Sequence, residues 1–435
     1  MSLGAPPQRP LTRSPTRRQI SILAGVAVVL VAAHVWYGNR NNFYDLKIYA
    51  AAMRWWDSGH PLYTFVKADD TQGQLGYTYP PFAAILMRPL AWLPLGLTIA
   101  IYVVVSVAAF AACVWWLVRP LADRHRVPPW FAFGLAFVLA SALEPIREAF
   151  TFGQINIVLW ALILFDLLVL LPPTNQHPPT NQHRWSRFAG VGIGLATAIK
   201  LVPGIFIVYL LVTRRFRAAG VAAGTAVAAT LLAAAVSPAQ SWTFWTDKVL
   251  QGDGVGQLAY EFNQSILGVL ARLALPGQPN RALWILIILP VLGYGMWRAR
   301  RASAAGDEVT GLTLAGLVGS LVSPVTWAHH IFWIVPALAV LVDTALRPEP
   351  VPLVSGLRGR AGPFTLAAVA YLTITVSLVA LWSFALHKPG GLTAFIMSDW
   401  YVWLMLAMLP LLPVRRQTQP RPAADPVQAE VAQRP

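Results

Sequence analysis

One acid follows the first apolar run of the chain, in a sequence that holds few charges elsewhere. In "NNFYDLKIYAAAMRWW" (41–56) it is Asp45, at the start of a segment with apolar and aromatic residues among polar ones. A carboxylate beside a substrate hydroxyl can take its proton as a general base. A carboxylate in the first turn of a helix is also stabilised by the helix dipole. Both interpretations of Asp45 stay open on this observation alone.

A second polar group interrupts two apolar runs in "LEPIREAFTFGQINIVLW" (143–160). Its ionisable and amide side chains are Glu144, Arg147, Glu148, Gln154 and Asn156. Pro145 and Gly153 are expected to break the helices here. Ionisable groups at a helix break in a membrane protein usually face a cavity rather than lipid. The stretch therefore predicts a functional cavity.

Three candidate cations lie in other apolar surroundings. Lys200, in "ATAIKLVPG" (196–204), either extends to the interface or faces an anion. His329 and His330, in "SPVTWAHHIFWIVPAL" (323–338), point about 100° apart on a helix and do not easily share one metal ion. With no carboxylate nearby and Cys113 as the single cysteine, no metal is predicted; hydrogen bonding or charge toward a phosphate is favoured.

Two further stretches contribute polar candidates. In "YTYPPFAAILMRPL" (77–90), Tyr79 precedes two prolines that start a helix abruptly. In "YEFNQSILGVLARL" (260–273), Asn263 and Gln264 begin an amphipathic segment, where a helix-capping role is the alternative.

The composition shows what kind of scaffold must position these residues. Of 435 residues, 56% are hydrophobic and 12% are charged, with a mean hydropathy of +0.55, whereas soluble proteins carry roughly 25% charged residues. The net charge of +15 comes from basic residues between the apolar runs, which is the positive-inside pattern of a membrane protein rather than a nucleic-acid surface. The chain is therefore predicted to be an all-α, multi-pass membrane protein.

The apolar runs predict spans near 19–37, 98–118, 129–146, 154–171, 188–200, 203–213, 218–236, 281–297, 309–325, 329–344, 364–386 and 399–414. Residues 80–97 are expected to form a re-entrant or short helix, and Pro203 to interrupt the pair at 188–213. The segment 43–56 is expected to lie along the interface. One membrane domain (19–414) is predicted between disordered cytoplasmic tails (1–18 and 415–435), and the duplicated "PPTNQHPPTNQH" (172–183) to be a linker.

This topology places the loops 38–79, 237–280 and 387–398 and the junction 326–330 on the outer face. These segments hold Asp45, the amide pair and the two histidines, so chemistry is expected there. The sequence has no phosphate-binding glycine loop, no dinucleotide fingerprint and no D-x-D motif. A lipid-linked donor is therefore favoured over a nucleotide sugar.

The motifs "NNFYDLKIY", "YTYPPFAA", "EPIREAFTFGQIN", "AIKLVPG", "FNQS" and "SPVTWAHHIFW" occur in this order between about residues 40 and 345. Together they resemble the actinobacterial membrane mannosyltransferases of glycosyltransferase family 87. The resemblance implies a GT-C fold with about 11–13 transmembrane helices. It also implies an enzyme of the plasma membrane, with its active site on the outer, periplasmic side. Its donor is expected to be polyprenyl-phosphate-mannose and its acceptor a membrane glycolipid such as a phosphatidylinositol mannoside, linked α-1,2.

The resemblance also implies roles for individual residues. Asp45 matches the proposed catalytic base, and His329 or His330 would hold the donor phosphate, with Arg147 and Lys200 as further candidates. The side chains expected to bind the substrates are Tyr79, Glu144, Gln154, Asn156, Asn263 and Gln264. No metal and no other cofactor is expected.

Two alternatives remain at this stage. An arabinofuranosyl- or other pentosyltransferase would use the same architecture with a different prenyl-phosphate sugar. A lipid or sugar transporter would also have polar helix breaks beside a cavity, but it predicts two inverted halves of similar hydropathy, which the sequence does not display.

Overall fold

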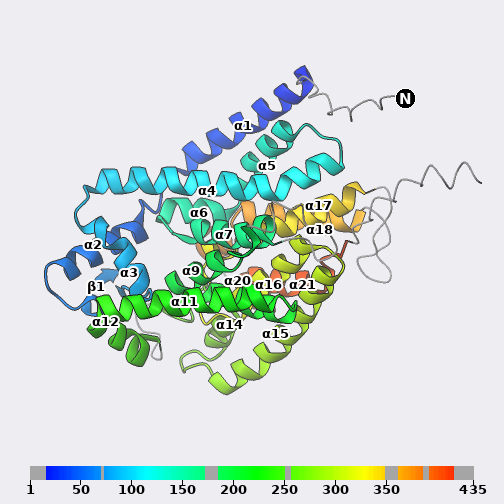
Figure 1. Cartoon of the computed structure of the whole chain (residues 1–435). Helices are drawn as coiled ribbons and strands as arrows, with labels where there is room; N and C mark the ends of the chain where they lie inside the picture. The colour runs from blue at the N-terminus through cyan, green and yellow to red at the C-terminus, as the bar shows by residue number, and fades with distance from the viewer. Residues whose placement is uncertain are drawn as a thin grey trace, which may run out of the picture.

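The computed structural model describes residues 16–69, 73–171, 185–249, 256–347, 361–385 and 391–415 (Figure 1). Within these ranges nearly all regular structure is helical, as predicted. The exception is a short antiparallel hairpin that was not predicted, formed by β1 (Val66–Asp69) and β2 (Gly73–Gly76). The duplicated linker at 172–183 lies outside the described residues, as do most residues of the two predicted tails.

Three of the described helices are long and apolar enough to cross a membrane: α4 (Leu95–Arg124), α11 (Phe216–Val236) and α15 (Arg281–Ala304). Most of their side chains remain exposed, as expected for helices that face lipid. Bent pairs raise the number of candidate spans to six: α5 (Pro129–Ser141) with α6 (Glu144–Phe152), α18 (Ala361–Thr375) with α19 (Leu378–Ala385), and α20 (Leu392–Ser398) with α21 (Trp400–Leu411). The number of 11 to 13 transmembrane helices stays a prediction.

Several predicted boundaries agree with the structure. The first apolar run forms α1 (Arg17–Tyr37), which begins with a capping box between Thr16 and Gln19. Residues 80–97 contain the expected short helix, as α3 (Pro81–Met87) and the 3₁₀ turn η2 (Arg88–Ala91).

The segment 188–213 is broken in "KLVP" (200–203), as expected, although the helix ends before the proline. It forms α9 (Val191–Ile199), the turn η4 (Val202–Gly204) and α10 (Ile205–Val212). The helix stops at Lys200, whose backbone is extended, before Pro203 is reached. The amine of Lys200 is therefore presented from a break between two helices.

The polar stretch 143–160 has a helix of its own, α6, which bends by 71° from α5. The break lies upstream of Pro145, because proline fits the first turn of α6 without loss of a hydrogen bond. Gly153 ends α6 in a left-handed conformation, with φ of 79°, and α7 (Asn156–Leu164) then continues as a π-helical turn, η3 (Phe165–Leu170).

The centre of the molecule is α16 (Glu308–Val322), in which every residue from Thr310 to Leu321 is buried. It packs against α10, α15, α21 and α17 (Ile334–Leu346). The turn η6 (Ala328–His330) lies between α16 and α17, so both histidines belong to a short connection at the end of the central helix.

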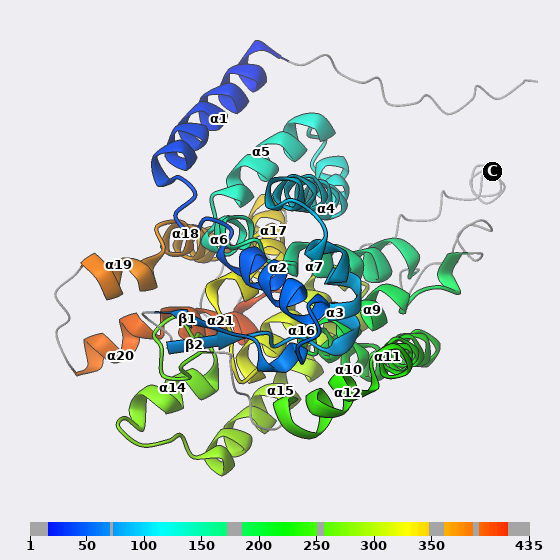
Figure 2. The ribbon, with the colours of Figure 1, turned by 90° about the vertical axis from the view of Figure 1, so that its left-hand side faces the viewer.

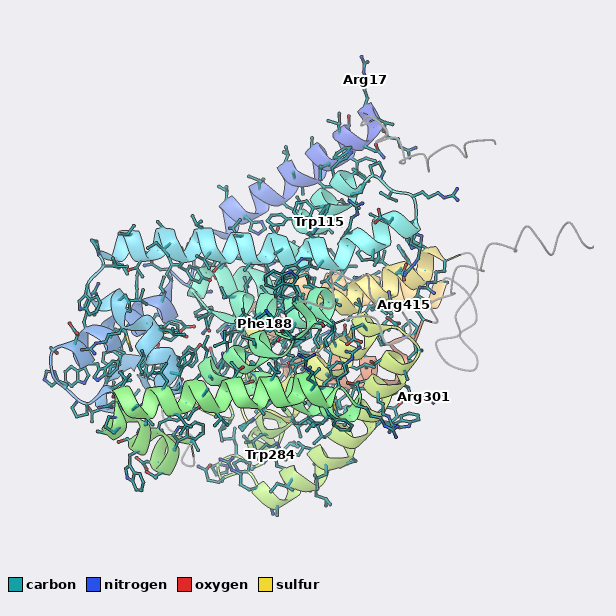
Figure 3. All side chains as sticks on the ribbon, viewed as in Figure 1. Arg17, Trp115, Phe188, Trp284, Arg301 and Arg415 are labelled. Atoms are coloured by element: carbon teal, nitrogen blue, oxygen red, sulfur yellow. The ribbon has the colours of Figure 1, made fainter. Side chains whose placement is uncertain are left out.

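The two ends of the molecule differ in charge and in structure. Arg17, Arg301 and Arg415 lie at the right-hand end in Figure 3. There Arg415, at the start of the predicted tail, is buried and paired with Asp307 and Asp343. The left-hand end holds α2 (Tyr44–Asp57), the turn η1 (Leu62–Thr64), the hairpin, α12 (Pro238–Thr243) and the π-helical turn η5 (Phe244–Lys248) (Figure 1). Seen from this end, α2 and the hairpin lie over the centre, with α14 (Ile266–Leu273) beside them (Figure 2).

Gly153 holds α2 against the break between α6 and α7. A Cβ atom at this position would lie 2.5 Å from Cβ of Leu46, and the left-handed backbone disfavours any side chain. The neighbouring contact is a hydrogen bond of 2.7 Å from the backbone N–H of Phe43 to the carbonyl of Thr151. The first turn of α2 is thus positioned by a residue more than a hundred positions away.

We expect Gly153→Ala to lower the stability of the protein by about 2–4 kcal/mol, from backbone strain and overpacking. Thermal unfolding in detergent would measure this. Gly220→Ala in α11 is the matched control, because a Cβ atom there meets nothing within 4 Å and alanine favours the helix. Equal unfolding midpoints for the two variants would contradict the role assigned to Gly153.

Candidate active site

A cavity of about 1350 Å³ opens beside α2 and the hairpin. Eight of the predicted site residues line it: Asp45, Tyr79, Glu144, Arg147, Gln154, Lys200, His329 and His330. They come from α2, the start of α3, α6 and its end, the break after α9, and η6. The fold thus gathers polar groups that are separated by almost 300 positions in the sequence.

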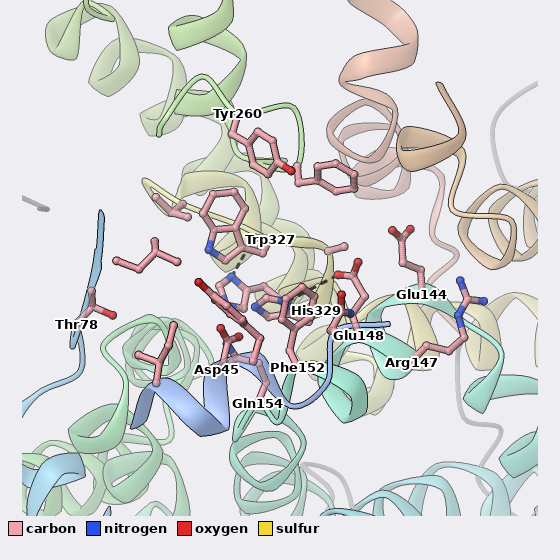
Figure 4. A pocket seen from close by; sticks show the side chains of 18 of the residues that line it. Asp45, Thr78, Glu144, Arg147, Glu148, Phe152, Gln154, Tyr260, Trp327 and His329 are labelled. Carbon is pink, nitrogen blue, oxygen red and sulfur yellow. Dashed lines mark hydrogen bonds and ion pairs between the residues drawn. The ribbon is translucent and has the colours of Figure 1, made fainter. Parts of the chain in front are cut away.

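Asp45 lies in the first turn of α2 and faces this cavity (Figure 4). Its Oδ2 accepts a hydrogen bond from Nε2 of Gln154. The surrounding protein raises the pKa of Asp45 above its ordinary value, because burial disfavours the charged carboxylate; the hydrogen bond from Gln154 acts in the opposite direction. A carboxylate with a raised pKa is a stronger base than an exposed one.

A chain of hydrogen bonds fixes the amide of Gln154. The hydroxyl of Tyr79 donates to Oε1 of Gln154 at 2.9 Å, and the hydroxyls of Tyr49 and Tyr79 are 2.8 Å apart. Because Tyr79 uses its proton on Gln154, Tyr49 must donate to Tyr79. Every hydrogen bond of the chain is therefore donated in the direction of Asp45, and Oδ2 of Asp45 accepts the last one.

Two side chains hold Lys200 in the wall of the cavity. Its Nζ lies 3.0 Å from Oδ1 of Asn156 and 2.9 Å from Nε2 of His330. Asn156 also donates to the backbone carbonyl of His329 at 3.1 Å, and the backbone N–H of Trp327 donates to Nδ1 of His330 at 3.2 Å. Asn156 lines a small pocket behind Lys200 rather than the main cavity.

His329 has a different environment from its neighbour. Its ring lies 5.6 Å from that of Phe152 and is nearly perpendicular to that of His330. Its Nδ1 is 3.8 Å from a carboxylate oxygen of Glu148, and neither ring nitrogen makes a hydrogen bond to another described residue. A buried imidazole in this state can still donate to, or accept from, a ligand.

Glu144 and Arg147 form the far wall of the cavity, away from Asp45 (Figure 4). Glu144 accepts a hydrogen bond from the hydroxyl of Tyr401. Arg147 donates to the carbonyl of Thr375 at 2.8 Å and to the hydroxyl of Ser377 at 2.7 Å, where α18 bends into α19. The structure therefore places Arg147 where it joins α6 to the α18–α19 bend.

Asn263 and Gln264 do not line the cavity, contrary to the expectation that they contact sugar. Both are completely buried. The amide of Asn263 bonds to backbone groups of Leu258, Pro324 and Thr326. That of Gln264 bonds to those of Glu261, Ser398 and Tyr401. These amides connect the loop before α14 to neighbouring segments, because an unpaired backbone group would be costly there.

Other cavity residues were not singled out from the sequence. Among them are Tyr49, Phe152, Tyr260 and Trp327. Glu148, which was expected to face a cavity, was assigned no role of its own. The spacing of four residues between Glu144 and Glu148, and between Asp45 and Tyr49, was a usable signal, since such residues share a helix face. Among the described residues, no group of three histidine, cysteine or acidic side chains is arranged to hold a metal ion.

Comparisons with known proteins show the family of the chain. The model of glycosyltransferase family 87 matches residues 77–324. The polyprenol-phosphate-mannose-dependent alpha-(1-2)-phosphatidylinositol mannoside mannosyltransferase of Mycolicibacterium smegmatis is 35% identical over 385 residues, which cover 84% of this chain and 82% of that protein. The enzyme of the same description from Mycobacterium tuberculosis is 34% identical, covering 74% of each chain.

A third relative, the polyprenol-phosphate-mannose-dependent alpha-(1-2)-phosphatidylinositol pentamannoside mannosyltransferase of M. tuberculosis, is 32% identical over 72% of this chain and 69% of its own length. No solved structure matches the chain. The family match covers more than half of the sequence, and the similarity to these relatives extends over most of it. The chain therefore belongs to glycosyltransferase family 87 and is a membrane glycosyltransferase.

Proposed function

We propose that the protein transfers mannose from polyprenyl-phosphate-mannose to a membrane glycolipid, a phosphatidylinositol mannoside that receives an α-1,2 linkage. The names of the relatives support this donor and acceptor class. The observation that carries the proposal is the cavity itself, where Asp45 accepts a hydrogen bond from Gln154 while Lys200 and the two histidines lie nearby. One side offers a base, and the other offers groups suited to a phosphate.

Asp45 is the general base of this mechanism. The acceptor hydroxyl attacks the anomeric carbon of the donor mannose as Asp45 takes its proton. The bond from that carbon to the phosphate oxygen breaks, and the prenyl phosphate leaves with the electron pair. Phosphate is a good leaving group and needs no general acid. A single displacement inverts the configuration, so a β-mannosyl donor gives an α-linked product.

The donor phosphate is assigned to Lys200, His329 and His330. Negative charge accumulates on this phosphate as the bond breaks, so donors aimed at it stabilise the transition state more than the ground state. Tyr79, Gln154 and Glu148 lie close enough to the carboxylate to contact sugar hydroxyls. Arg147 and Glu144 would act on a more distant part of a substrate, at the far wall.

We assign the active site to the outer face of the membrane. The basic residues Arg17, Arg301 and Arg415 lie at the end opposite α2 and the hairpin (Figures 1 and 3). Basic residues are concentrated on the cytoplasmic side of membrane proteins. A lipid-linked donor fits this side, because it needs no soluble nucleotide.

We expect Asp45→Asn to reduce mannose transfer by at least about 100-fold, because the amide keeps the size of the side chain but cannot act as a base. Radiolabelled polyprenyl-phosphate-mannose and endogenous glycolipids in membranes of matched expression give the measurement. Asp57→Asn is the control, since Asp57 ends the same helix outside the cavity and pairs with Arg88. Equal rates for both variants would exclude Asp45 as the base. If the wild type transfers only arabinose from its prenyl-phosphate donor, the mannose assignment is wrong.

As the pH is lowered, the turnover rate should begin to fall at a higher pH than it would if the base were an aspartate of ordinary pKa. The base acts only when ionised, so a raised pKa moves the acidic limb of the profile upward from about 4. Turnover should therefore increase as pH rises through this limb, measured with both substrates saturating. A rate that stays constant down to about pH 4 would contradict the assignment.

Lys200→Met should raise the donor KM by roughly 10- to 100-fold, since a hydrogen bond to a charged group contributes about 1.5–3 kcal/mol. The acceptor KM should change much less. Lys47→Met, on α2 but outside the cavity lining, provides the matched control. An effect confined to the acceptor KM would place the phosphate elsewhere.

A further inference from the structure

The hydrogen bonds around Lys200 form a chain that ends on a backbone group at each side. At one end the carbonyl of His329 can only accept, so Asn156 must donate its Nδ2 there and turn Oδ1 toward Lys200. At the other end the N–H of Trp327 can only donate, so Nδ1 of His330 must accept and carries no proton. The backbone groups therefore determine which atom donates and which accepts at each end of the chain.

These two ends determine the protons between them. A neutral histidine whose Nδ1 accepts carries its proton on Nε2, and Nε2 of His330 lies 2.9 Å from Nζ of Lys200. An Nε2–H group needs a lone pair opposite it. An ammonium has three N–H groups and no lone pair, whereas a neutral amine has one. The amine can also donate to Oδ1 of Asn156, so every bond in the chain is satisfied.

The other proton arrangements bring two donors together. A charged Lys200 would direct N–H toward Nε2–H of His330. Moving the histidine proton to Nδ1 would direct it against the N–H of Trp327. A doubly protonated His330 would likewise direct Nδ1–H against the N–H of Trp327. Each arrangement loses a hydrogen bond in a partly buried site, where unsatisfied polar groups are costly.

The groups that face Lys200 come from four parts of the fold: α2, the start of α3, α7 and η6. Asn156 belongs to α7 and His330 to η6, and the Tyr79 ring beside α3 lies 5.2 Å from Nζ. Asp45, on α2, is the acid that interacts with Lys200 electrostatically, and His329 adds a second imidazole. Asp45 alone would favour the ammonium form, but it makes no direct contact with Lys200 among the described hydrogen bonds and ion pairs.

We infer that Lys200 rests as a neutral amine held by His330, and that it takes up one proton when the phosphate of a lipid-linked sugar binds. The inference rests on the proposed function, which supplies the phosphodiester ligand. One proton leaves hydronium or a buffer acid and forms an N–H bond with the lone pair of Nζ, and no other covalent bond changes. The Lys200–His330 hydrogen bond is then lost, and the ammonium and Nε2–H of His330 both donate to phosphate oxygens. His330 thus keeps the amine in place and uncharged until donor arrives, and then contacts the phosphate itself.

Calorimetric titration of the full-length protein in detergent tests this inference directly. The probe is a short-chain prenyl-phosphate-mannose without acceptor, because its phosphodiester does not titrate near neutral pH. Titrations in two buffers of different ionisation enthalpy give the number of protons taken up. At pH values above the titration midpoint of Lys200 in the free protein, we expect the uptake of about one proton per bound donor. In the same pH range the donor affinity should weaken about tenfold per pH unit.

Two variants should abolish proton uptake while binding persists. Lys200→Arg is charged at every pH used, and His330→Gln offers an amide oxygen that accepts from an ammonium. For both, we expect the donor affinity to change less than about twofold per pH unit between pH 7 and 9. Size-exclusion profiles and thermal unfolding establish that the variants are folded.

His60→Gln is the matched control, because His60 lies outside the cavity lining and should leave proton uptake intact. His329→Gln tests the neighbouring imidazole, which makes no hydrogen bond to Lys200. Uptake that disappears in His329→Gln but persists in Lys200→Arg would place the proton on His329 and overturn the inference. Wild-type binding without uptake would overturn the inference but not the proposed function. Absence of donor binding by the wild-type chain would overturn both.

Discussion

The arrangement of this cavity depends on one constraint, that a polar group away from water must have a partner. The constraint separates side chains that serve the fold from those left for a ligand. The side-chain amides of Asn263 and Gln264 form hydrogen bonds with backbone groups, whereas the ring nitrogens of His329 make no hydrogen bond among the described residues. The same requirement gives direction to the bonds that end on Asp45 and to those around Lys200. This criterion leaves the ring nitrogens of His329 for a ligand, whereas Asp45, Lys200 and His330 have partners of their own.

Positioning of the proposed base, Asp45, depends on packing between segments far apart in the chain. Gly153 lets the end of α6 approach Leu46, and the Phe43 N–H binds the carbonyl of Thr151. These contacts place Asp45 on α2 against Gln154, which follows α6 directly. α2 also packs against η2, α3, η1 and α4, but the contact with α6 positions its first turn. The helix break beside the cavity thereby also orients the proposed base.

Much of this site was predictable from the sequence, for identifiable reasons. Asp45, Lys200 and the histidines are polar residues in apolar surroundings. The free-energy cost of placing ionisable groups there indicates a functional role. Asn263 and Gln264 were misleading, since an amide that binds a backbone carbonyl looks in sequence like one that binds sugar. The hairpin was missed because its four-residue strands lack an alternating apolar pattern. The Gly153–Leu46 contact joins distant segments, and no local pattern reports it.

The proposed proton states of Asp45 and Lys200 account together for the movement of charge during transfer. Before the reaction, the site holds one negative charge on Asp45 and one on the donor phosphodiester, with Lys200 charged once donor is bound. Afterwards Asp45 is protonated, and the departing phosphate carries two negative charges. The net charge of the site is unchanged, but one negative charge has moved from the base to the phosphate beside an ammonium. Because opposite charges attract strongly in a low-dielectric cavity, the ammonium of Lys200 stabilises the charge that grows on the phosphate and favours the transition state over the bound donor.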